Sequence, residues 1–168
     1  MIPKSMALIG FAGSGKTAAG MLAARELGLP FTDLTDSLPK IQDGTNIDEL
    51  HSLATLQLSK ASVGGGIVAC NDSVVMMPRN RRILEESFVT VLLDAPFEVL
   101  FSRLEVSGKP LSYHHSKTEL AKLYELRAPQ YEECARYTLD ASLPIEELAS
   151  AIAEIAISEG CVDVNNLI

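Results

Sequence analysis

The segment Gly10-Phe11-Ala12-Gly13-Ser14-Gly15-Lys16-Thr17 constrains this chain more than any other. It matches the phosphate-loop pattern, in which two glycines separated by four residues are followed by Lys and Ser or Thr. Residues 6–9 before it predict a buried strand, and residues 16–27 after it have the apolar spacing of a helix. Glycines let a backbone wrap around an anion, and a helix N-terminus favours negative charge. The segment therefore predicts a strand–loop–helix unit that binds a nucleoside triphosphate.

The chemistry of the loop assigns roles to individual residues. Lys16 can reach the β- and γ-phosphates, and the Thr17 hydroxyl can ligate Mg²⁺. We therefore expect Mg²⁺ as the cofactor, with ATP as a co-substrate. The residues expected to bind the nucleotide are Gly13, Ser14, Gly15, Lys16, Thr17 and Ala18.

Strand and helix signals alternate along the chain, which predicts a parallel sheet with helices on both faces. Further strands are predicted at 29–35, 87–95 and 137–141, and helices at 46–60, 97–106, 144–158 and from a capping box at 116–119. We predict an α/β fold of the P-loop nucleoside-triphosphate hydrolase type, with a five-stranded parallel sheet sandwiched by helices. In such sheets the ligands bind at the carboxyl ends of the strands.

The third core strand has two candidate positions. Residues 72–78 (DSVVMMP) have the higher β-propensity and precede a helix predicted at 79–86, so we favour them. In that case, Gly64-Gly65-Gly66 belongs to the preceding connection. The alternative is a poorer strand at 60–63 that the glycines follow.

Length and charge limit the class of protein. A chain of 168 residues suits a single domain over 1–168, and a net charge of −8 argues against a general nucleic-acid binder. Three widely spaced cysteines, Cys70, Cys134 and Cys161, indicate reduced thiols in a cytoplasmic protein. No apolar run is as long as a membrane helix. We expect a cytoplasmic monomer with neither nucleic acid nor membrane as a partner.

Three segments carry a resemblance to one family. LIGFAGSGKT, then a helix and LGLPFTDLTD, looks like the start of a shikimate kinase. Residues 126–133 (LRAPQYEE) resemble the Arg-x-Pro-x-Tyr segment of that family. Lys109-Pro110-Leu111 resembles its lid motif, which is normally Arg-Pro-Leu. The order and spacing of these segments agree with the family over most of the chain.

This resemblance implies a kinase of small metabolites, with the fold of the shikimate and nucleoside monophosphate kinases. The acceptor-binding segment would be about 34–62 and the lid about 107–117. The partners would be ATP and a small hydroxylated anionic metabolite. Shikimate is the first expectation, and the reaction would then give shikimate 3-phosphate and ADP.

The resemblance also implies roles for single residues. Asp33 would contact the Mg²⁺ shell and orient or deprotonate the acceptor hydroxyl; a solvated carboxylate is the alternative. Arg127 would bind the acceptor carboxylate with its planar guanidinium; an ion pair with Glu132 or Glu133 is the alternative. Lys109 would close over ATP and balance charge on the γ-phosphoryl group. The predicted catalytic residues are Lys16, Asp33 and Lys109, the predicted metal ligands are Thr17 and Asp33, and the predicted acceptor ligands are Asp33, Asp36 and Arg127.

The chain departs from the family pattern on the acceptor side. The family's second strand ends Asp-x-Asp, whereas here Thr35 stands at the second position and Asp36 follows it. The family's Phe-Arg-x-x-Glu segment is missing, and Lys60 is the only basic residue in the corresponding stretch. The family's Gly-Gly-Gly follows the third strand; with a strand at 72–78, Met77-Pro78-Arg79 would stand there.

These departures leave two alternative functions open. One is a kinase for another small acceptor, either gluconate-like or a nucleoside monophosphate. A nucleotide acceptor needs several arginines in the lid, and residues 105–117 contain none. The other is a degenerate paralogue that binds nucleotide without transferring a phosphoryl group.

Overall fold

Five parallel strands form one sheet in the order β2-β3-β1-β4-β5 among the residues that the structure describes. The computed structural model describes residues 3–35, 43–107, 116–163 and 165. The strands are β1 (Met6–Ile9), β2 (Phe31–Asp33), β3 (Ile67–Ala69), β4 (Val89–Asp94) and β5 (Tyr137–Asp140). The helices are α1 (Lys16–Leu27), α2 (Ile47–Ser62), α3 (Pro78–Ser87), α4 (Phe97–Ser107), α6 (Lys117–Cys134) and α7 (Ile145–Ser158), with a 3₁₀ turn, η1 (Val74–Met76). This confirms the predicted α/β fold and its five-stranded sheet.

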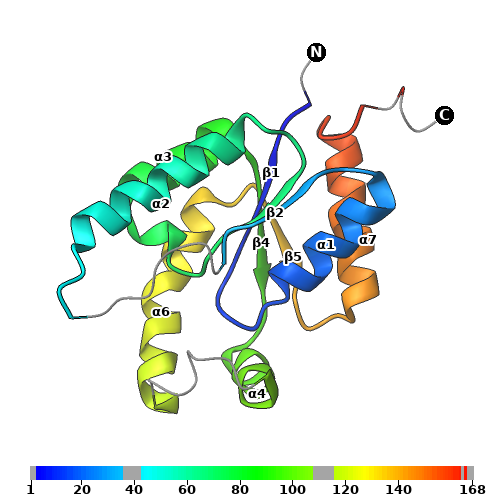
Figure 1. The fold of residues 1–168 in the computed structure, drawn as a ribbon. Coiled ribbons are helices and arrows are strands. Elements are labelled where there is room, and N and C mark those ends of the chain that lie inside the picture. The colour runs from blue at the N-terminus through cyan, green and yellow to red at the C-terminus, as the bar shows by residue number, and fades with distance from the viewer. Residues whose placement is uncertain (1–2, 36–42, 108–115, 164, 166–168) are drawn as a thin grey trace.

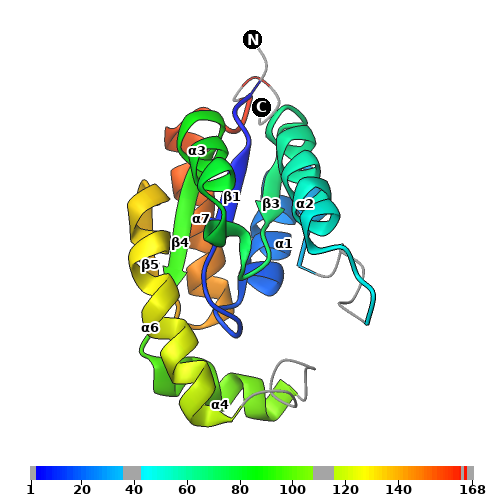
Figure 2. The ribbon, with the colours of Figure 1, turned by 90° about the vertical axis from the view of Figure 1, so that its left-hand side faces the viewer.

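The helices form one layer on each side of the sheet (Figure 1). Helices α1 and α7 cover one face, while α2, α3 and α6 cover the other, as the second view confirms (Figure 2). Helix α4 lies beyond the carboxyl ends of the strands. The central strand β1 is fully buried because strands flank it on both edges and helices cover both faces. That is why its sequence is a continuous apolar run.

The predicted boundaries hold for most elements. Strand β1 and helix α1 have the predicted bounds, and α3, α4 and α7 begin and end within a residue of theirs. Strand β2 is shorter than the predicted 29–35, and α2 continues two residues beyond 60. The capping box is confirmed, since the Ser116 side chain accepts a hydrogen bond from the Glu119 amide at 3.2 Å. No helix in the described ranges is long and apolar enough to cross a membrane.

The predicted position of the third strand is wrong. Strand β3 spans Ile67–Ala69, whereas residues 72–78 form η1 and the start of α3, and residues 60–62 end α2. Val74 and Val75 are apolar because they are buried beside α3 and α6, and not because they pair with a strand. A three-residue strand leaves little periodic signal in a sequence.

The glycines at 64–66 lead into β3. They therefore belong to the connection before the third strand, as the favoured interpretation predicts. Gly66 has φ +80°, and a Cβ there would lie 2.2 Å from the carbonyl oxygen of Pro30. Only glycine fits this turn beside β2. The segment that follows β3 is therefore Cys70 to Ser73, and neither the glycine run nor Met77-Pro78-Arg79 stands there.

Candidate active site

The phosphate loop, residues 10–17, connects β1 to α1 at the carboxyl edge of the sheet. The buried Lys16 ammonium donates to the carbonyl oxygens of Gly10 and Phe11, at 2.6 and 3.1 Å. Helix α4 packs against the loop: a Cβ on Gly13, which has φ +85°, would lie 2.8 Å from the Leu100 carbonyl oxygen. The loop and the start of α1 thus place Lys16 and the backbone amides of Ser14 to Ala18 together, as the motif predicts.

Two residues from distant elements, neither of them predicted from the sequence, brace this loop. Arg103 of α4 donates to the Gly13 carbonyl oxygen at 3.2 Å. The Tyr124 ring of α6 meets the Phe11 ring edge-on, with centroids 5.5 Å apart. Tyr124 also donates to Asp94, at the end of β4, at 3.1 Å. These contacts fix the loop against α4 and α6.

Thr17 and Asp33 come together beside the loop. The Thr17 hydroxyl donates to Asp33 Oδ2 at 3.1 Å. The other carboxylate oxygen, Oδ1, accepts from the Thr35 amide at 2.9 Å and from the Thr35 hydroxyl at 2.5 Å. Three donors therefore hold one carboxylate in a fixed orientation. Thr35, which stands where the family has a second Asp, binds Asp33 instead.

This pair fits Mg²⁺. A hydroxyl and a carboxylate oxygen are hard ligands, and Mg²⁺ in such enzymes is usually bound by one or two protein groups together with substrate phosphates and water. Thr17 directly follows Lys16 and Asp33 is the last residue of β2, so both oxygens are at the edge where the loop binds phosphate. Asp33 is exposed, which leaves room for water around an ion.

Arg127 lies on α6 and binds the segment that follows β3. Its Nη1 donates to Asp72 Oδ2 at 2.7 Å, and the two side chains are 10% and 24% exposed. One helical turn further on, the Tyr131 hydroxyl donates to the Asp72 carbonyl oxygen at 2.5 Å. Burial and the charge of Asp72 raise the pKa of Tyr131, so the phenol stays protonated and remains a donor. Asp72 was not among the residues predicted from the sequence.

The two glutamates proposed as alternative partners of Arg127 do not pair with it in the described residues. Glu133 instead lies 3.5 Å from Arg81 of α3. Arg81 also donates to the Val75 carbonyl oxygen at 2.6 Å. Arg127 is thus directed toward the carboxyl edge of the sheet rather than along its own helix.

Lys60 does not replace the arginine that the family has in this region. It lies in the last turn of α2, and the carbonyls of the next two residues, Ala61 and Ser62, accept from the Ser5 hydroxyl at 3.3 and 2.9 Å. Ser5 directly precedes β1, so this end of α2 lies at the amino edge of the sheet. The phosphate loop lies at the opposite edge.

Cys70 lies between the two sides of the site. Its amide donates to the Leu8 carbonyl oxygen at 3.0 Å, and its side chain is fully buried. Burial raises the pKa of the Cys70 thiol to about 12, although the positive charge of Lys16 lowers it in part. The thiol is therefore neutral and unsuited to act as a nucleophile.

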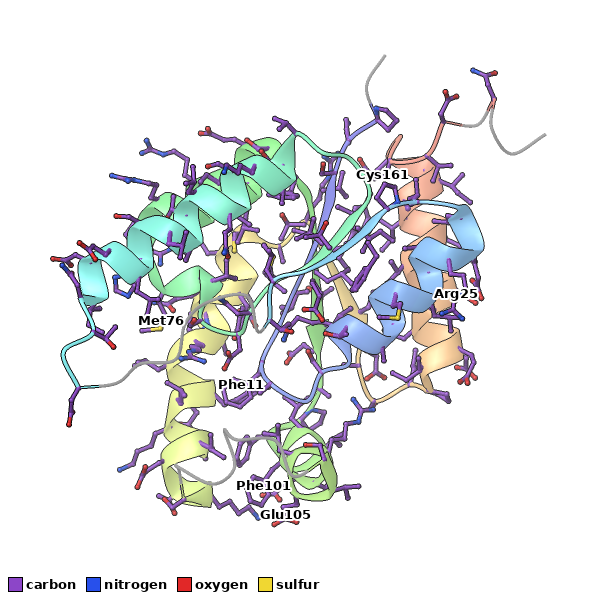
Figure 3. All side chains as sticks on the ribbon, in the orientation of Figure 1. Phe11, Arg25, Met76, Phe101, Glu105 and Cys161 are labelled. Carbon is purple, nitrogen blue, oxygen red and sulfur yellow. The ribbon has the colours of Figure 1, made fainter. Side chains whose placement is uncertain are left out.

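The predicted residues Asp36 and Lys109 lie outside the described residues, so their roles stay predictions. Among the described ones, Lys16, Thr17 and Asp33 meet at the phosphate loop, while Arg127 meets Asp72 on the other side of Cys70. In Figure 3, the labelled Phe11 marks the loop and Met76 marks the segment beside α6.

The chain is similar to known kinases over most of its length. Residues 12–156 match the shikimate kinase family model. The chain is 33% identical to the shikimate kinase of Geobacter sulfurreducens over 162 residues, which cover 89% of each protein. It is 30% identical to that of Enterococcus faecalis over 148 residues, which cover 82% of this chain and 88% of the relative.

Solved structures share the fold. A shikimate kinase from Acinetobacter baumannii in complex with shikimate superposes with a TM-score of 0.81 and 24% identity, covering 93% of this chain and 94% of that one. A gluconokinase from Sinorhizobium meliloti has a TM-score of 0.67 and 20% identity, covering 95% and 94%.

Proposed function

The chain belongs to the shikimate kinase family, and on this basis we propose that it transfers the γ-phosphoryl group of ATP to a hydroxyl group of shikimate. The observation that carries the proposal is the joint position of Lys16, Thr17 and Asp33 at the carboxyl edge of the sheet. A phosphate-binding cation, a hydroxyl and a carboxylate are the groups that phosphoryl transfer requires next to each other.

In the proposed mechanism, the phosphate loop and the N-terminus of α1 bind the β- and γ-phosphates. Lys16 exchanges its contacts with the Gly10 and Phe11 carbonyls for phosphate oxygens. Its positive charge then stabilises the negative charge on the transferred group. Thr17 and Asp33 would hold Mg²⁺, which would neutralise part of the phosphate charge.

Asp33 orients the acceptor hydroxyl. The hydroxyl oxygen forms a bond to the γ-phosphorus while the bond between that phosphorus and the β–γ bridging oxygen breaks, which releases ADP. The hydroxyl proton leaves to Asp33 or to water. The contacts from Thr17 and Thr35 keep the carboxylate in one orientation, which favours a productive approach.

Arg127 is the proposed acceptor ligand, because a guanidinium binds a carboxylate through two parallel hydrogen bonds. We also propose that Lys109 closes over the nucleotide and that Asp36 contacts the acceptor, as the resemblance implies. The resulting protein binds ATP and a small hydroxylated acid.

The experiment that tests the proposal is a coupled ADP-release assay with Mg·ATP against shikimate, gluconate and the common nucleoside monophosphates. We expect ADP release that depends on shikimate, with the phosphorylated product detected by mass spectrometry. ADP release with another acceptor alone, or Mg·ATP binding without any acceptor-dependent release, would overturn it. The second outcome would favour a nucleotide-binding paralogue without transfer activity.

A further inference from the structure

The ion pair between Asp72 and Arg127 joins two segments that are 55 residues apart in the sequence. Asp72 follows β3, and Arg127 lies in the third turn of α6. The 2.7 Å distance and the low exposure of both side chains make this a close and largely buried contact. A cation that is expected to recognise an acceptor therefore already binds a carboxylate of its own chain.

Each nitrogen of the Arg127 guanidinium is either in contact with another side chain or buried. Nη1 donates to Asp72, Nη2 lies 3.5 Å from the thioether sulfur of Met76, and Nε is buried. Within the part of the chain that the structure describes, Nε has no hydrogen-bond partner. A two-pronged contact needs two donors on one side of the guanidinium. With Nε buried, a ligand carboxylate that makes that contact must use Nη1 and Nη2, and at Nη1 it meets the carboxylate of Asp72.

The backbone of Asp72 is fixed from the same helix. The Tyr131 hydroxyl donates to its carbonyl oxygen, so α6 contacts this residue at two points one turn apart. The raised pKa of Tyr131 keeps that donor protonated. Asp72 is thus held in place by the helix that carries its partner.

Asp72 also lies at the edge of the sheet that carries the reacting groups. It comes three residues after Ala69, which pairs with Asp33 in the sheet register, and two residues after Cys70, whose amide binds β1. The related family has a run of glycines after this strand and therefore no side chain there. This chain has Asn71, Asp72 and Ser73.

We propose that Asp72 is a specificity-determining residue that competes with the acceptor's carboxylate for Arg127. An acceptor carboxylate must share Arg127 with Asp72 or displace it, and in either case it approaches the negative charge of that side chain. Because repulsion from Asp72 offsets the attraction of Arg127, the acceptor carboxylate gains little net affinity from its contact with Arg127, and an uncharged analogue of the same shape binds about as well. This inference rests on the proposed function, because it concerns the acceptor side of that site.

The test compares shikimate with its methyl ester, which keeps the hydroxyl groups and removes the charge. For wild type we expect the two kcat/KM values to agree within about threefold. For Asp72→Asn we expect shikimate to exceed the ester by about tenfold or more, because a charged acceptor strengthens a hydrogen bond to Arg127. Asp72→Gly, which removes the side chain, is the second variant if Asp72→Asn does not fold. Glu133→Gln removes one negative charge from α6 beside Arg81 and is expected to keep the wild-type ratio.

A wild-type protein that prefers shikimate over the ester by about tenfold, with the same ratio in the Asp72 variant, would overturn the inference. If neither acceptor gives ADP, the proposed function fails, and equilibrium binding decides the inference on its own. Calorimetric titration of shikimate in the presence of Mg·ADP should then show binding to Asp72→Asn about tenfold tighter than to wild type. Binding that is unchanged, weaker or absent in the variant would overturn it.

Discussion

The phosphate loop and the acceptor side meet at one edge of the sheet, but their contacts span very different distances along the chain. Lys16 binds carbonyl oxygens that lie six and five residues away. Arg127 binds a carboxylate that lies 55 residues away, on a segment that only the folded sheet brings near. The nucleotide half is thus a local structure, whereas the acceptor half is a junction between β3 and α6.

Because the two halves are built from different parts of the chain, they can change independently. A motif of eight residues in a strand–loop–helix context is sufficient to build the phosphate cradle. The acceptor half depends on which side chain meets Arg127 at the junction. One residue there can alter what the site accepts while the loop stays as it is.

The largest expected effect is at the local half. Lys16→Ala should lower kcat by about 10³-fold, because it removes a preorganised charge from the transferred phosphoryl group. The measurement is the coupled ADP-release assay, with nucleotide binding by calorimetry. Lys122→Ala, an exposed lysine on α6, is the matched control and should behave as wild type. An active Lys16→Ala protein would contradict the assignment of the loop.

A smaller effect is expected where the loop meets β2. Asp33→Asn should lower kcat by about 10²-fold, because it weakens both the binding of Mg²⁺ and the positioning of the acceptor hydroxyl. Titration with Mg²⁺ should reveal a higher concentration for half-maximal rate. A variant with unchanged magnesium dependence would show that Asp33 acts on the acceptor alone. Asp33 would then belong to the acceptor half of the site.

The ion pair of the acceptor half should stabilise the fold through coupling. Asp72→Asn and Arg127→Met should each lower the free energy of unfolding by about 1–3 kcal/mol, since each leaves a largely buried partner unmatched. The double variant should lose less than the sum of the two, by about 1–2 kcal/mol. Urea unfolding of the four proteins measures this cycle. Additive losses would mean that the pair carries no coupling, and the junction would be no more than a close approach.

The smallest effects are expected at the N-termini of α2 and α6. Variants there serve as the reference case, in which the losses of unfolding free energy should add. Asn46 caps α2 and Ser116 caps α6, and each side chain accepts a backbone amide hydrogen bond at 3.2 Å. Asn46→Ala and Ser116→Ala should each cost about 1 kcal/mol of unfolding free energy. Their double variant should lose the sum within about 0.5 kcal/mol, since the caps share no contact. Strong coupling between them would remove the contrast with the Asp72–Arg127 pair.

The same contrast explains how far the sequence predicts this molecule. Strand β1, the phosphate loop and α1 follow from adjacent residues, so their bounds agree with the prediction. The short strand β3 was not predicted, because its three residues give a weaker strand signal than the longer segment at 72–78. An apolar segment indicates burial but not the kind of element, and the burial of residues 74–75 beside α3 and α6 gives the same pattern as a buried strand.

The site divides in a similar way. The contact between Thr17 and Asp33 could be expected, because Thr17 lies in the first turn of α1 and Asp33 ends β2 at the same edge. The partner of Arg127 could not, because sequence proximity favours Glu132 and Glu133 while the fold supplies Asp72. Arg103 was missed for the same reason: its contact with Gly13 spans 90 residues.

The buried thiol of Cys70 can serve as a probe of local opening. Only a thiolate reacts readily with maleimides and disulfide reagents, and the raised pKa of this enclosed thiol leaves almost none at neutral pH. The rate at which Cys70 is labelled, measured by mass spectrometry, therefore reports how often the sheet edge between the phosphate loop and the Asp72–Arg127 pair opens. A nucleotide that binds the loop and an acceptor that binds at the junction should each slow the labelling of Cys70. The rates would show how firmly each ligand closes its own side.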